Sequence, residues 1–137
     1  MEDIKMKDAK MKVFEAFEHG RLELPDKTIS FEEIAWTKHP KFEGVEQKNI
    51  ITAKDTEGKF SYHLVHVVPN CSIGEHIHEG QLETHEVVAG NGVCVNAGVE
   101  LAYEVGTISI MPAGVKHEVN AGEEGLYLFA KFIPALC

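Results

Sequence analysis

The chain has 137 residues, of which 44% are hydrophobic and 26% charged, and its formal net charge is −9. This length and balance fit one soluble globular domain, and the acidic charge disfavours binding to nucleic-acid phosphates or anionic membranes. No apolar run reaches the roughly 18 residues of a membrane-spanning helix, and residues 1–12 lack the apolar core of a secretory signal. We therefore expect a cytoplasmic protein.

Residues 1–49 are interpreted as an N-terminal arm, because they are too irregular for a second domain. Val13, Phe14 and Phe17 share one face at helical spacing and Gly20 follows as a stop, so this part is compatible with a short helix. The rest, up to residue 49, carries scattered apolar residues and turn signals such as His39-Pro40. We expect the arm to pack on the following domain or on a dimer partner.

Residues 50–137 have the pattern of β structure, in which runs rich in β-branched and aromatic residues alternate with Gly, Pro and Asn. The expected strands are 49–53, 60–68, 83–89, 93–96, 99–104, 107–111, 117–120 and 126–133. Turns are expected at 55–58, 69–70, 90–92 and 112–114. About eight short strands separated by turns predict an antiparallel sandwich or barrel.

The sharpest local feature is His76-Ile77-His78. In extended backbone, residues two apart point to the same side, so both imidazoles can reach one point about 2 Å away, as a metal ion requires. Glu83 follows a loop long enough to bring its carboxylate back to that point, and His117 lies far along the chain. Three imidazoles and one carboxylate suit Fe, Mn, Ni, Co, Cu or Zn and do not choose among them.

The frame around these residues resembles the two motifs of the cupin family, G-x5-H-x-H-x(3–4)-E-x6-G and G-x5-P-x-G-x2-H-x3-N. The first is matched by the histidine pair, Glu83 and Gly90. The second is matched by Gly106, Pro112, Gly114 and His117. The resemblance covers roughly residues 60–133 and rests on several spacings that coincide in order, which a lone H-x-H would not provide.

Two positions depart from the family motifs. Asn70 stands where the first glycine falls, and Ala121 stands where the last asparagine falls. Asparagine tolerates positive φ better than other non-glycine residues, so a Pro69-Asn70 turn can supply the same backbone geometry. Neither position is a metal ligand in cupins, so the ligand set is complete in this chain.

The resemblance implies an all-β fold, the double-stranded β-helix or jelly-roll barrel of cupins, over residues 50–137. It also implies one divalent transition metal as cofactor. The ligands carried over from the family are His76, His78, Glu83 and His117.

Three further histidines need placing. Strand alternation puts His85 on the same face as Glu83, so we expect it to face the cavity, as a proton-transfer group or a substrate contact. The alternative is an internal histidine satisfied by a neighbour. His63 and His66 lie on opposite faces of the strand 60–68, and the sequence does not say which one faces inward.

Three functions are compatible with such a site. Four protein ligands on an octahedral ion leave up to two positions for substrate, so a metalloenzyme acting on a small organic molecule is favoured, of dioxygenase, isomerase or lyase type. The second is a metal-dependent module that binds or senses a small ligand without catalysis, and the third is a storage or structural barrel. We expect a homodimer, because exposed sheet edges need cover.

Overall fold

The computed structural model describes residues 11–137, so the expectation about a secretory signal in residues 1–12 falls almost wholly outside the described part. Within residues 11–137, no helix is long and apolar enough to cross a bilayer. The strands, in chain order, are β1 (Arg21–Leu24), β2 (Lys27–Ser30), β3 (Thr37–Lys38), β4 (Val45–Ile51), β5 (Ser61–Val67), β6 (Ser72–His76), β7 (Leu82–Asn96), β8 (Val99–Tyr103), β9 (Ile108–Met111) and β10 (His117–Ile133). Helical turns occupy residues 11–18, η1 (Phe31–Glu33) and α2 (Ala53–Thr56).

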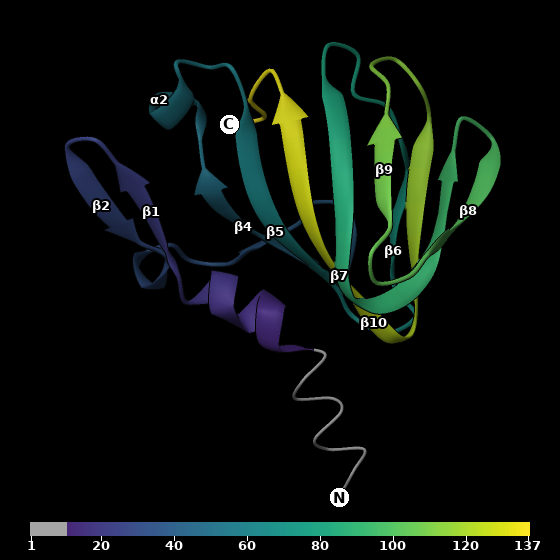
Figure 1. The fold of residues 1–137 in the computed structure, drawn as a ribbon. Coiled ribbons are helices and arrows are strands. Elements are labelled where there is room, and N and C mark those ends of the chain that lie inside the picture. Colours follow the sequence, from purple (N-terminus) through teal and green to yellow (C-terminus); the bar gives the residue numbers. More distant parts are fainter. Residues whose placement is uncertain (1–10) are drawn as a thin grey trace, which may run out of the picture.

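Apart from the β1–β2 hairpin, these strands form one antiparallel sheet that folds over into a jelly-roll barrel (Figure 1). The first half of β7 pairs with β9 and the second half with β8, while the first half of β10 pairs with β6 and the second with β5. Each long strand thus belongs to both walls of the barrel. The predicted all-β fold with a short N-terminal helix is confirmed.

The prediction was wrong where it divided β7 and β10 into separate strands at residues 90–92 and 121–125. Both strands continue through these positions and bend together at one end of the barrel (Figure 1). Gly90 has a φ of +77°, and a Cβ there would lie 2.1 Å from the carbonyl oxygen of Gly125, which has a φ of +76°. Glycine signals a turn and a bulge alike, and here it permits a bulge with close backbone contact.

Three other local expectations can be compared with the structure. Asn70 has a φ of +64°, as the substitution of asparagine for glycine predicts. The expected turn at 55–58 is instead the end of α2, whose start is capped by Asp55 accepting from the Thr52 backbone N–H at 2.9 Å. The proposed boundary at residues 49/50 falls within β4, which pairs with β5 from Val45 onward.

Two hydrophobic clusters hold the fold. The first lies in the barrel interior and consists of Val45, Val65, Val67, Val87, Cys94, Tyr103, Val119, Leu126, Leu128, Ala130 and Phe132. The second lies on the outer face of β5 and β10 and consists of Phe14, Phe31, Ile50, Leu64 and Phe129. The N-terminal segment therefore covers an apolar outer face of the sheet.

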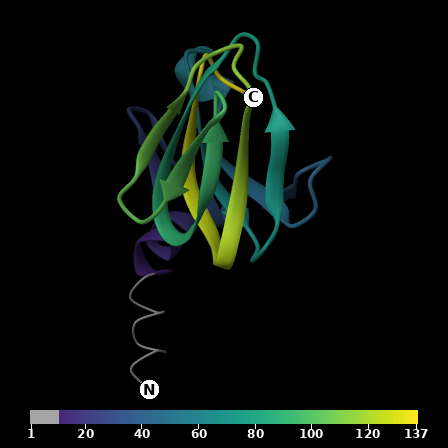
Figure 2. The ribbon, with the colours of Figure 1, turned by 90° about the vertical axis from the view of Figure 1, so that its right-hand side faces the viewer.

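The helical segment 11–18 contributes less apolar surface to this contact than its pattern predicts. Phe14 is buried, but Val13 and Phe17 are 52% and 46% exposed. The buried Lys48 ammonium donates to the Glu18 carbonyl at 2.8 Å, at the end of the helical segment, where a positive charge is favourable. In Figure 2 this segment (purple) and the β1–β2 hairpin (dark blue) lie behind the barrel strands.

His63 is the histidine of β5 that faces the barrel interior. It is 1% exposed and its ring nitrogens lie 2.7 Å from Asn49 Oδ1 and 2.7 Å from Ser61 Oγ. His66 lies on the outer face, stacked on Tyr127 with ring centroids 4.3 Å apart. Burial lowers the pKa of His63 to about 4, although the Glu83 charge acts in the opposite direction.

We expect His63 to make the protein less stable in acid. Its folded pKa of about 4 lies below its unfolded value of 6.5, so the unfolded chain binds the extra proton first and stability is lost as pH falls from 6.5 towards 4. The loss is at most about 3 kcal/mol. Urea unfolding between pH 4 and 7 should show a shallower pH dependence for His63→Gln than for the parent. His66→Gln serves as the control, and an equal change in both variants would contradict the assignment.

Candidate metal centre

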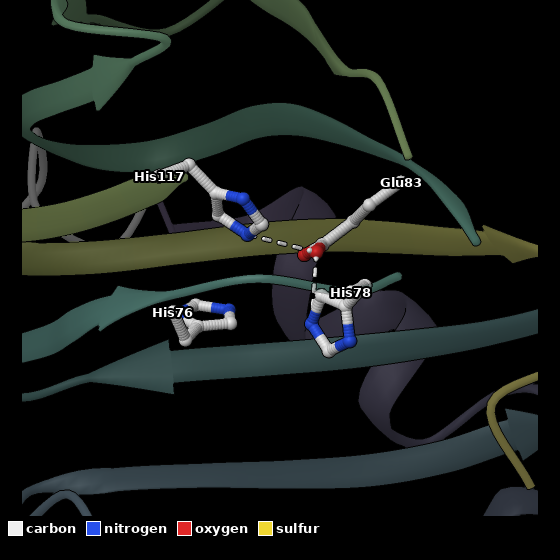
Figure 3. Close-up of side chains that lie close together, drawn as sticks. All are labelled: His76, His78, Glu83 and His117. Carbon is white, nitrogen blue, oxygen red and sulfur yellow. Dashed lines mark hydrogen bonds and ion pairs between the residues drawn. The ribbon is translucent and has the colours of Figure 1, made fainter. Parts of the chain in front are cut away.

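The four predicted ligands come together at the end of the barrel opposite the bends of β7 and β10. His76 is the last residue of β6, and His117, the first residue of β10, is its direct partner in the sheet. Glu83 is the second residue of β7, on the facing wall, and His78 lies in the loop between β6 and β7. Figure 3 shows the four side chains pointing toward one another.

The spacing of these groups fits one metal ion. His117 Nε2 lies 3.1 Å from Glu83 Oε1, and His78 Nε2 lies 3.4 Å from the same oxygen. Two ligand atoms bound about 2.1 Å from one ion, at tetrahedral or octahedral angles, are about 3.0 to 3.4 Å apart. All four ligand atoms lie within 4.8 Å of one another. A pair at that distance would close by about 0.6 Å to take trans octahedral positions, or by about 1.4 Å to take neighbouring positions.

The hydrogen bonds of the His76 and His117 rings are also compatible with metal binding. His76 Nδ1 lies 2.7 Å from the Gly74 carbonyl oxygen and His117 Nδ1 lies 3.4 Å from the Val115 carbonyl oxygen. A carbonyl only accepts, so each Nδ1 carries a proton and Nε2 is the ring atom that can bind a metal. His117 Nε2 donates to Glu83 Oε1 in the structure, and a metal ion would take the place of that proton. Burial lowers the pKa of both His76 and His78, which favours the neutral form that a ligand needs.

Glu83 is the electrostatic centre of the cluster. It is 5% exposed. Burial by itself would raise its pKa, but the charge of His85 and hydrogen bonds from His117 and His85 outweigh burial and hold the pKa well below its usual range. The side chain is therefore a carboxylate, which is the form that binds a cation.

His85 lies behind Glu83, as strand alternation predicts. Its Nε2 is 2.5 Å from Glu83 Oε2 and its Nδ1 is 2.9 Å from the Tyr103 hydroxyl, all within the buried interior. No signal in the sequence indicates that Tyr103 contacts His85. Tyr103 pairs with Gly92 in the β7–β8 hairpin, and only the bend of β7 brings it to His85 in the first half of that strand. Because both ring nitrogens are engaged, the geometry favours a role for His85 through Glu83 over direct contact with a substrate.

A cavity of about 450 Å³ is lined by three of the four ligands, His76, His78 and Glu83. Its apolar lining consists of Pro40, Phe42, Val45, Val65, Ile73, Ile77, Ala130, Phe132 and Leu136. Its polar lining beyond the four-residue cluster consists of His39, Lys41, Gln47, Glu75 and His85. Sequence reasoning missed the contribution of residues 39–42, because no spacing signal relates them to the motifs.

Comparison with known proteins identifies the class. The Cupin domain model matches residues 63–131, half of the chain, so the protein belongs to the cupin family. The comparison with curated proteins found no match.

Solved structures share the fold over most of this chain. A predicted oxalate decarboxylase from Thermotoga maritima is 24% identical, with a TM-score of 0.68 over 75% of this chain and 95% of that one. KdgF from Halomonas sp. is 19% identical, with a TM-score of 0.65 over 75% and 88%. The polyketide cyclase RemF from Streptomyces resistomycificus is 20% identical, with a TM-score of 0.64 over 75% of each chain. These identities support the shared fold and leave the activity of this chain open.

We expect His85→Phe to weaken metal binding about ten- to a hundredfold, because Glu83 Oε2 would lose its donor and the carboxylate its fixed orientation. Competition with a chromophoric chelator measures the affinity. Tyr103→Phe, which removes only the hydroxyl behind His85, should have a smaller effect. His66→Phe, on the outer face of the barrel, is the matched control. Unchanged affinity in His85→Phe would rule out this positioning role.

Proposed function

We propose that the protein binds one divalent transition metal ion through His76, His78, Glu83 and His117 and acts as a metalloenzyme on a small organic molecule. The observation that supports this most directly is a four-ligand cluster within 4.8 Å that opens into a cavity of about 450 Å³. Cavities of roughly 300–1,000 Å³, mostly apolar with a few polar groups, are typical of small-molecule sites.

The metal ion and the residues around it would have different roles at this site. A bound metal supplies a Lewis acid and coordination positions for a substrate, as dioxygenase, isomerase and lyase reactions require. Glu83 contributes the negative charge that holds the cation, and His85 keeps its carboxylate oriented. Phe132, whose ring centroid is 5.0 Å from that of His78, contributes apolar surface that limits access of water to the ligands.

The second candidate is a metal-dependent module that binds or senses a small ligand without turnover. The same cavity supports it, because it has polar groups for recognition. A storage or structural barrel is favoured less, since such a barrel is expected to be filled by side chains and this one has space beside the cluster.

Metal analysis tests the site. Protein purified without chelators should hold about one transition metal ion per chain, and His76→Ala and His117→Ala should lose most of it, because each removes one of four ligands. His66→Ala should keep the metal content of the parent protein.

Turnover distinguishes the enzyme from the binding module. The protein is incubated with a panel of small organic acids and ketones, with and without O₂, and mass spectrometry detects any product. Turnover lost in His76→Ala supports the enzyme, and binding without turnover supports the module. Metal content equal in all variants would refute the site.

We also propose that the protein works in the cytoplasm as a homodimer. Cys71, Cys94 and Cys137 are free thiols, which suits a reducing compartment. Ile108 and Ile110 point outward from β9 and are 70% and 58% exposed, and a second copy would cover them.

Light scattering should give twice the chain mass, and Ile108→Lys combined with Ile110→Lys should shift it toward the monomer, because charges placed in an apolar contact are costly to desolvate. Val99→Lys, at an exposed valine in β8, is the control. A monomeric parent protein would contradict the homodimer.

A further inference from the structure

The outer wall of the cavity is the loop of residues 39–42, between β3 and β4. Its four residues line the same cavity as His76, His78 and Glu83. The loop lies outside the segment matched by the family model, residues 63–131. It is therefore a part of the site for which the family motifs provide no role.

The loop is held in one conformation. The Phe42 ring lies over Gly74 of β6, where an added Cβ would be 2.7 Å from the ring. Its ring centroid is 6.1 Å from that of His76 and 4.6 Å from that of His39, on which it stacks. The backbone N–H of His39 also donates to the Val45 carbonyl at 2.8 Å. A wall fixed in this way does not need to be ordered when a ligand binds.

The hydrogen bonds of the His39 ring define its tautomer. Nδ1 lies 3.1 Å from the backbone nitrogen of Lys41 and 3.2 Å from that of Phe42. Both partners can only donate, so Nδ1 is the acceptor and the proton of the neutral ring is on Nε2. The ring thus offers an N–H donor on the side away from the loop backbone.

The charges at this wall favour an anion. Glu75 is paired with Lys116 at 3.7 Å. Lys41 has no carboxylate within ion-pair distance among residues 11–137, so its positive charge is available to a ligand. The rest of the cavity lining is mostly apolar and includes Val65, Ile73 and Phe132, with Gln47 as a polar side chain among them.

We propose that the cavity binds a small dicarboxylate, with one carboxylate at the metal and the other accepting a hydrogen bond from His39 Nε2 beside Lys41. The apolar lining contacts the carbon chain of the ligand. This inference rests on the proposed metal site and names the chemical class of its ligand. His39 is a binding residue in it, and selectivity comes from the arm rather than from the metal ligands.

The test uses His39→Asn, which separates the two roles of the ring. The asparagine Oδ1 takes the place of Nδ1 and can accept from the Lys41 N–H, and asparagine before proline favours turns, so the loop conformation is retained. The Nε2 donor is lost. Calorimetry of the Zn²⁺-loaded protein with oxalate, malonate, succinate and glutarate measures binding, and butyrate is the monocarboxylate control.

The tightest dicarboxylate should bind about tenfold or more weakly to His39→Asn, because a hydrogen bond to a charged group is removed. Butyrate affinity and the visible spectrum of the Co²⁺-loaded protein should not change, since the metal ligands are intact. His66→Asn, a matched change on the outer face, should bind like the parent. Lys41→Met should weaken dicarboxylate binding several-fold, and added salt should reduce the difference.

Two results would overturn this inference alone: dicarboxylate affinity equal in parent and His39→Asn, or equal loss for dicarboxylates and butyrate. A long-range ¹H–¹⁵N spectrum of the parent gives an independent measurement, and a proton on Nδ1 of His39 would also overturn it. If the protein binds no Zn²⁺ or Co²⁺, the proposed function fails and this inference with it. If metal binds normally and only the His39 results fail, the proposed function stands.

Discussion

The antiparallel pairing of β7 with β10 is the constraint on which the rest of the structure depends. The two strands pair on both sides of a common bend, from Leu82 opposite Ile133 to Asn96 opposite His117. Because they bend together, each contributes to both walls of the barrel, and the first residues of both strands lie at the same open end. That geometry brings Glu83 and His117 from facing walls to 3.1 Å.

This arrangement buries the carboxylate of Glu83, which costs free energy. An ionised Glu83 in the barrel would be unfavourable without compensation, and the compensation comes from imidazoles at separate places in the chain. His117 and His78 face one of its oxygens, and His85, backed by Tyr103, holds the other. His85 and Tyr103 therefore fix the orientation of the Glu83 carboxylate on one side, and the other side of the cluster is open to the cavity. A metal centre that a substrate can reach needs this arrangement.

The N-terminal segment links this centre to the rest of the chain. Phe14 and Phe31 cover the outer face of the sheet, and Lys48 fixes the end of the helical segment. The β3–β4 loop that follows completes the cavity wall through Phe42 over Gly74. Motifs shared across the family can thus provide the metal ligands, while the segment outside the matched region shapes the cavity in which a ligand is chosen.

Features set by local backbone periodicity could be predicted from the sequence. Residues two apart in extended chain share a side, which is why His76 and His78 converge and why His85 lies with Glu83. The turn at Asn70 followed from the tolerance of asparagine for positive φ. The barrel class followed from the succession of short apolar runs and turn residues, and the family motifs added His117.

Features set by contacts between distant segments required the tertiary structure. A glycine such as Gly90 is compatible with a turn and with a bulge. Only the contact of its backbone with that of Gly125 shows that it forms a bulge in a continuous strand. His63 and His66 differ only in which face of β5 meets the interior. The loop at His39 reaches the metal ligands because β4 pairs with β5. By itself the sequence determined which residue types gather at the site, and the non-local strand pairing decided what surrounds them.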